Sequence, residues 1–120
     1  MKILVSDDVS EKGVEVLRAQ GYDVDVKINL NEEDLIACIG EYDGLVTRSM
    51  THVTEAVINA GKKLKVIGRA GVGVDSIDIK TATAKGIIVV NAPTANTVAA
   101  TEHTCAMIMA ITRHIPQAHN

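Results

Sequence analysis

The sequence predicts a doubly wound α/β domain, in which a parallel sheet carries helices on both faces. Short apolar runs typical of buried strands alternate with segments of helical periodicity, and the connections between them are short. Apolar residues make up 47% of the 120 residues, yet Phe and Trp are absent, so the core must be aliphatic. An aliphatic core suits a parallel sheet that is buried by helices, and the length suits one domain.

The first two β-α units carry clear boundary signals. Residues 3–5 form a short apolar strand, and Ser10 is expected to cap a helix that ends at Gly21. Apolar and polar residues alternate over residues 24–28, which indicates a strand with one solvated face at an edge of the sheet. Asn31 then caps a second helix with an acidic first turn, as the helix dipole favours.

Three more units follow with the same logic. The remaining strands are expected at residues 44–46, 66–67 and 87–90. Thr51 or Thr54 caps the helix after the third strand, and Asp75 and Ser76 offer N-caps for a helix that begins near Ile77. With the second strand at an edge, we expect the flavodoxin-like order 2-1-3-4-5.

A glycine-rich turn follows the fourth strand and is the main candidate site. Gly68, Gly71 and Gly73 surround Arg69, and exposed backbone N–H groups in such turns can bind anions. A nucleotide fingerprint would have Gly or Ala where Ser76 stands. We therefore expect a backbone-plus-arginine site for a small acid, with a purely structural turn as the alternative.

Two of the four arginines lie where adjacent strands end. Arg48 follows the third strand and Arg69 ends the fourth. Neighbouring parallel strands lie about 4.8 Å apart, so both guanidinium groups could reach one anion. The alternative is that both are solvated surface residues.

Several classes of function are disfavoured by charge and composition. A net charge of −3, with no basic run longer than Lys62-Lys63, argues against nucleic acid and against an anionic membrane surface. The N-terminus reads as neither a signal peptide nor a spanning segment, and Cys38 and Cys105 are expected to be free buried thiols. These features indicate a cytoplasmic protein.

Metal and general acid–base chemistry find little support. The histidines lack metal-ligand spacing, and the adjacent Glu102 and His103 point about 100° apart on a helix, so they cannot act on one atom. We expect no metal site and no catalytic residue in this chain.

The last helix, expected over residues 97–114, does not suit a lone domain. Residues 105–111 are seven apolar residues in a row, which cover nearly two helical turns on every side. A helix that is apolar all round is buried all round, so a second domain or another copy of the chain should cover it.

Four segments together resemble one family. Residues 46–49 (VTRS), 66–78 (VIGRAGVGVDSID), 86–93 (GIIVVNAP) and 96–104 (NTVAATEHT) are similar to the N-terminal part of the D-2-hydroxyacid dehydrogenases. The resemblance implies that residues 1–96 are a substrate-binding domain and residues 97–120 an interdomain helix that leads toward an NAD-binding domain. It also implies NAD as cofactor, a phosphorylated 2-hydroxy acid as substrate, and a homo-oligomer.

The resemblance also implies residue roles. The substrate phosphate and carboxylate would be bound by Arg48, Ser49, Arg69, Ala70, Gly71 and Asn96, and Val72 would lie near the nicotinamide. The family's cofactor glycine fingerprint and its catalytic Arg, Glu and His have no counterpart in these 120 residues. We therefore expect the chain alone to be inactive.

Three other functions are compatible with a domain of this size and fold class. A receiver domain needs an Asp after the third strand, where Thr47-Arg48-Ser49 stands, so Asp7 and Asp8 are better interpreted as turn and cap residues. A flavodoxin needs a phosphate loop after the first strand and aromatic residues, and both are missing. A stand-alone module that binds a small acid or dimerises through the last helix stays open.

Overall fold

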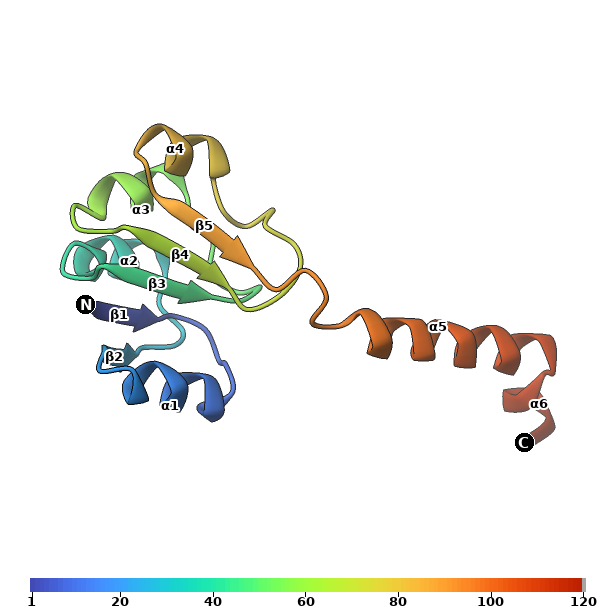
Figure 1. Cartoon of the computed structure of the whole chain (residues 1–120). Coiled ribbons are helices and arrows are strands. Elements are labelled where there is room, and N and C mark those ends of the chain that lie inside the picture. Colours follow the sequence, from blue (N-terminus) through green and yellow to red (C-terminus); the bar gives the residue numbers. More distant parts are fainter. Residues whose placement is uncertain (120) are drawn as a thin grey trace.

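The computed structural model describes residues 1–119 and contains a five-stranded sheet in the order β2-β1-β3-β4-β5 (Figure 1). The strands are β1 (Lys2–Val5), β2 (Asp23–Val26), β3 (Gly44–Thr47), β4 (Val66–Arg69) and β5 (Ile88–Asn91). The helices are α1 (Glu11–Ala19), α2 (Glu32–Ile39), α3 (Glu55–Ala60), α4 (Ile79–Ala84), α5 (Thr97–Thr112) and α6 (Ile115–His119). All neighbouring strands pair in parallel, which confirms the predicted flavodoxin-like α/β fold.

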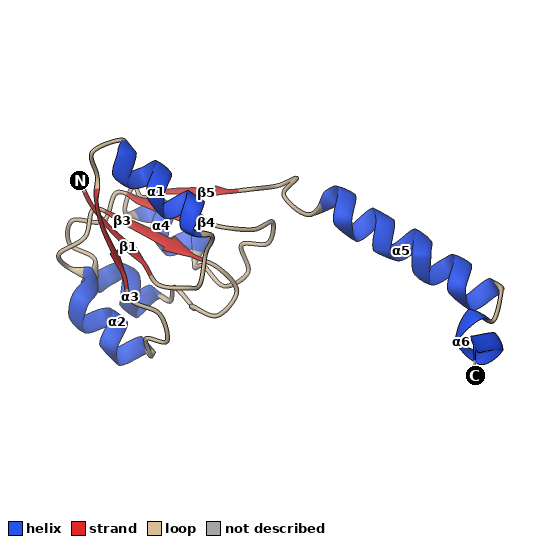
Figure 2. Ribbon diagram, turned by 90° about the horizontal axis from the view of Figure 1, so that it is seen from below, coloured by secondary structure: helices blue, strands red, loops and turns tan. Residues whose placement is uncertain are grey.

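Helices lie on both faces of the sheet, but they cover the two faces unequally (Figure 2). Side chains alternate along each strand, so Leu4 and Ile67 join the large core beneath α2, α3 and α4, while Ile3 faces α1. The register places Ile88 in the same row as Ile3, on the α1 side. Ile88 is 63% exposed, because α1 lies over β1 and β2 and does not reach β5.

Two predicted caps are confirmed and a third is incomplete. The Asn31 side chain accepts a hydrogen bond from the Asp34 N–H (2.7 Å) at the start of α2, and the Thr54 hydroxyl accepts one from Val57 (3.4 Å) at the start of α3. Ser10 holds the N-cap position of α1, but its side chain makes no capping hydrogen bond.

The prediction for the start of α4 is wrong. This helix begins at Ile79, and its N-cap is Asp78, whose carboxylate accepts from the Thr81 N–H at 3.0 Å. The delay has a tertiary cause, because Ile77 forms a parallel bridge with Val53 that holds the backbone extended. Asp75 and Ser76 therefore lie in the turn before the helix rather than at its cap.

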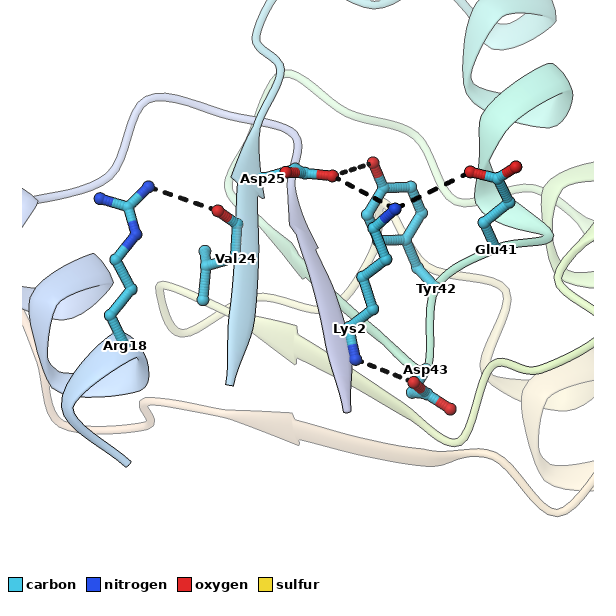
Figure 3. A network of polar contacts seen from close by, with 7 residues as sticks. All are labelled: Lys2, Arg18, Val24, Asp25, Glu41, Tyr42 and Asp43. Atoms are coloured by element: carbon cyan, nitrogen blue, oxygen red, sulfur yellow. Dashed lines mark hydrogen bonds and ion pairs between the residues drawn. The ribbon is translucent and has the colours of Figure 1, made fainter. Parts of the chain in front are cut away.

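A polar network holds the edge strand β2 against the sheet (Figure 3). The buried Tyr42 donates its hydroxyl to Asp25 Oδ2 at 2.7 Å, and the Lys2 ammonium lies 3.7 Å from the same oxygen. The Lys2 backbone N–H donates to Asp43 at 2.8 Å. The Tyr42 hydrogen bond lowers the pKa of Asp25, and burial followed by this hydrogen bond raises the pKa of Tyr42.

The long helix α5 extends away from the sheet (Figure 1). It ends at Thr112, and His114 (φ 54°) turns the chain into α6, so the predicted end at His114 is two residues too long. Its apolar residues are exposed rather than buried, as Ile108 (57%) illustrates, because no element of the sheet domain packs against the described part of the helix. Residue 120, the last of the expected 97–120 segment, lies outside the described residues.

The exposed helix also corrects the expectation for the cysteines. Both thiols are free, but Cys105 on α5 is exposed and Cys38 on α2 is only half-buried.

Within residues 1–119, no helix has both the length and the apolar character needed to cross a membrane.

Candidate functional site

The candidate site lies at the carboxyl ends of β3, β4 and β5. Thr47, Arg69 and Asn91 are register partners across these three strands, so the segments that follow them leave the sheet side by side. Ligands of open parallel sheets bind at this edge. Two segments build the site, the β3–α3 segment (residues 48–51) and the glycine turn (residues 69–76).

The Arg69 side chain folds back over its own turn. Its Nε donates to the Gly73 carbonyl oxygen at 2.6 Å. A Cβ on Gly71 would lie 3.0 Å from Arg69 Nη1, closer than carbon and nitrogen normally approach. Neither Gly71 nor Gly73 has a positive φ, so the absence of a side chain at Gly71 leaves room for the guanidinium and does not serve an unusual backbone conformation.

Hydrogen bonds from β3 and β5 hold the glycine turn in place. The Asn91 side chain donates to the Val72 carbonyl (2.8 Å), and the Ala92 N–H donates to the Gly71 carbonyl (2.9 Å). The Ala70 N–H donates to Thr47 (2.8 Å). In the described part of the chain, the N–H groups of Val72 and Gly73 donate to no protein acceptor, so they are among the donors of this turn that a ligand can use.

A cavity of about 260 Å³ opens between the two segments. It is lined by Ser49, His52, Arg69, Gly73, Asp75 and Ser76. The Ser76 hydroxyl oxygen is buried and has no hydrogen-bond partner among the described residues. A guanidinium group beside hydroxyl groups is suited to an oxyanion such as a carboxylate, which accepts from both.

The structure brings together two of the residues predicted from sequence, Ser49 and Arg69. Arg48 instead turns toward the segment that follows β1, where its Nη1 donates to the Asp8 carbonyl at 3.1 Å. The two guanidinium groups therefore do not line one cavity, although both stand at the same edge of the sheet.

The other predicted residues lie around this cavity rather than in its lining. Gly71 lies beneath the Arg69 guanidinium, and Val72 is 40% exposed at the turn. Ala70 lines a separate apolar cavity of about 260 Å³ beside α1. Asn96 is the N-cap residue of α5 and makes no side-chain capping bond.

Three residues of the lining are not among the site residues expected from the sequence. The sequence indicates a helix cap at Asp75 and Ser76, and it gives no sign that His52 is a metal ligand or a catalytic base. The signal available in the sequence was proximity, because His52 lies three positions after Ser49 in the segment that leaves β3. No group of three His, Cys, Asp or Glu residues within 1–119 is arranged to hold a metal ion.

The sequence and the structure both match known proteins. Residues 3–117 match the family model "D-isomer specific 2-hydroxyacid dehydrogenase, catalytic domain". A D-3-phosphoglycerate dehydrogenase from Synechocystis sp. is 53% identical over 118 residues, which are 98% of this chain and 21% of that protein. The chain thus spans about a fifth of the length of the relatives it matches.

Solved structures agree with this assignment. A Thermus thermophilus protein superposes with a TM-score of 0.86 at 29% identity, over 98% of this chain and 39% of its own. The NAD⁺-bound 3-phosphoglycerate dehydrogenase of Entamoeba histolytica superposes with a TM-score of 0.81 at 34% identity, over 92% of this chain and 38% of its own. The chain therefore belongs to the D-isomer-specific 2-hydroxyacid dehydrogenase family, whose catalytic-domain model it matches along nearly its whole length.

Proposed function

We propose that this chain is the substrate-binding domain of an NAD-dependent D-3-phosphoglycerate dehydrogenase, which oxidises 3-phosphoglycerate to 3-phosphohydroxypyruvate in serine biosynthesis. The observation that carries the proposal is the cavity at the carboxyl edge of the sheet that is lined by both Ser49 and Arg69. The identity of 53% with a D-3-phosphoglycerate dehydrogenase supports the choice of substrate within the family.

The substrate carboxylate binds at Arg69 in this proposal. Because Nε is already bonded to the Gly73 carbonyl, the two Nη atoms are the guanidinium donors that remain for a carboxylate. The Ser49 hydroxyl and the N–H groups of Val72 and Gly73 supply further donors. The N–H groups of Ala70 and Gly71 are already bonded to the carbonyl oxygens of Thr47 and Arg69, so this proposal uses the N–H groups that follow them in the turn.

The substrate phosphate is assigned to Arg48. This residue is exposed, and only its Nη1 is bonded within the described chain, to the Asp8 carbonyl. Arg48 follows β3 directly, next to Ser49, so a ligand longer than a simple 2-hydroxy acid can extend from the Arg69 cavity toward it. An arginine is well suited to phosphate because it stays charged and donates in a fixed plane.

NAD supplies the hydride acceptor of the reaction when it is bound. The residues of this chain fit only one edge of that cofactor, since the exposed Val72 offers an apolar contact and the glycine turn lacks the third glycine of a nucleotide fingerprint. We assign the main NAD site to a further domain, to which the apolar helix α5 leads. We expect the 120 residues alone to transfer no hydride, the complete enzyme to be a homo-oligomer, and its location to be the cytoplasm.

An amide NMR titration of this chain with 3-phosphoglycerate tests the substrate assignment, with D-glycerate as the ligand that lacks phosphate. We expect saturable shifts at Ser49 and in residues 69–76, abolished by Arg69→Ala. Arg113→Ala is the matched control, because it removes the same charge at the end of α5. Arg48→Ala should weaken binding of 3-phosphoglycerate much more than binding of D-glycerate.

Each proposed element can fail separately in this titration. If Arg48→Ala weakens the binding of 3-phosphoglycerate and of D-glycerate by the same factor, the assignment of the phosphate to Arg48 is wrong. Saturable shifts with NAD alone would show that the glycine turn binds the cofactor instead of the acid.

A further inference from the structure

A buried carboxylate lies behind the β3–α3 segment. Asp7 lies two residues after the end of β1 and is only 4% exposed. Within the described residues it forms no ion pair with a lysine or arginine. A carboxylate in such a place is costly unless hydrogen-bond donors replace its water.

Among residues 1–119, all of the hydrogen bonds that Asp7 accepts come from the segment that carries Arg48 and Ser49. Oδ2 accepts from the Arg48 N–H at 2.6 Å and from the Thr51 N–H at 3.0 Å. Oδ1 accepts from the Thr51 hydroxyl at 2.6 Å. One side chain therefore ties both ends of residues 48–51 to β1.

Neighbouring bonds hold the same junction. The Ser6 N–H donates to the Val46 carbonyl at 3.0 Å, and Arg48 Nη1 donates to the Asp8 carbonyl. Asp7 itself does not line the cavity that contains Ser49 and Arg69; it lines a separate cavity, together with Asp8 and Thr51. Apart from the field of its charge, Asp7 can therefore affect a ligand in the Arg69 cavity only through the segment.

We propose that Asp7 is a positioning residue for acid binding: its carboxylate fixes residues 48–51 so that Ser49 faces Arg69 and Arg48 stands at the phosphate end of the cleft. The inference rests on the proposed function, because it takes the Arg69 cavity as the acid site. It replaces the earlier interpretation of Asp7 as a turn or cap residue.

Electrostatics and positioning predict opposite results for Asp7→Asn. Removing a negative charge near an anion site should tighten anion binding if charge alone matters. An asparagine, however, can keep these contacts only as neutral hydrogen bonds: its amide oxygen accepts from the Arg48 and Thr51 N–H groups, and its NH₂ donates to the Thr51 hydroxyl. Neutral hydrogen bonds are weaker than those to a carboxylate, so the segment loses part of its anchor. We expect the dissociation constant for 3-phosphoglycerate to rise about tenfold in Asp7→Asn.

Two further changes separate positioning from folding. Thr51→Val removes the hydroxyl donor and should also weaken binding about tenfold, whereas Thr51→Ser keeps the donor and should bind within about twofold of the wild type. Asp8→Asn is the charge control, since only the backbone carbonyl of Asp8 contacts Arg48, and it should bind as tightly as the wild type or more tightly.

The measurement is the amide NMR titration with 3-phosphoglycerate, together with hydrogen exchange of the Arg48 and Thr51 amides. Weakened binding with faster exchange of both amides in Asp7→Asn supports the inference. If the wild type binds 3-phosphoglycerate, and Asp7→Asn and Thr51→Val bind it with the same dissociation constant, this inference is wrong but the proposed function stands. Absence of binding by the wild type refutes the proposed function, and the positioning role with it.

Discussion

Replacing Gly71 by alanine tests the site with a single methyl group. The added Cβ would lie 3.0 Å from Arg69 Nη1 and 3.3 Å from Cζ. To reach an ordinary contact the guanidinium must move by at least about 0.4 Å. The hydrogen bond from Nε to the Gly73 carbonyl leaves the guanidinium little freedom to shift within the turn. We therefore expect this bond to break and the guanidinium to swing away from the turn.

The cost can be estimated from the hydrogen bonds that the guanidinium makes to an acid. Losing one charge-assisted hydrogen bond costs about 1.5–3 kcal/mol, which corresponds to about one to two orders of magnitude in the dissociation constant. Stability should not fall, because Gly71 has no positive φ and Arg69 is only half-buried. In Gly71→Ala, the free energy of unfolding from urea titration should therefore not fall, while calorimetry should show weaker binding of 3-phosphoglycerate.

Gly13→Ala is the matched control, because it adds the same methyl group away from the site. Gly13 lies in α1, and its added Cβ would meet nothing within 4 Å. We expect wild-type affinity for this variant. If Gly71→Ala binds the acid as tightly as the wild type, or if Gly13→Ala loses as much, the placement of the Arg69 guanidinium at the acid site is wrong.

Three further predictions concern the rest of the fold. The pKa of Tyr42 is raised in the folded state above its ordinary value of 10.0, so the protonated phenol stabilises the fold. This contribution to the free energy of unfolding is complete below that pH and is lost progressively as the pH rises above it. Urea unfolding near pH 11 should therefore show a smaller loss of stability in Tyr42→Phe than in the wild type, and an equal loss would contradict the reasoning. Asn31→Ala should cost about 1 kcal/mol in the same assay, whereas Ser10→Ala should cost less because its side chain makes no capping bond. Sedimentation equilibrium should show self-association of the wild type through α5 that Ile108→Glu reduces with unfolding unchanged; a wild type that stays monomeric at high concentration would argue against this surface.

Much of the fold follows from local patterns in the sequence. The aliphatic runs and the alternation over residues 24–28 placed the strands and the edge strand, because strand burial leaves a period of two in the sequence. Asn31 and Thr54 were identified as caps because a cap bonds to a backbone N–H three residues away. Interactions over such short spans are readable without a structure.

Long-range contacts decided the rest. Asp75 and Ser76 looked like caps, but the bridge between Val53 and Ile77 delays the helix, and Asp78 caps it instead. The apolar sequence of α5 predicted a buried helix, but none of its residues is buried, because no element of the sheet packs against the described part of it.

The candidate site divides in the same way. From its sequence alone, this protein has an arginine at the end of β4 and a serine just after β3, and the parallel order of the strands is enough to bring Ser49 and Arg69 together. Only the tertiary structure decided that Arg48 turns to the Asp8 carbonyl and that the buried Asp7 holds its segment. The physical reason is that these bonds join residues about forty positions apart, whose proximity comes from strand pairing and leaves no local periodicity to read.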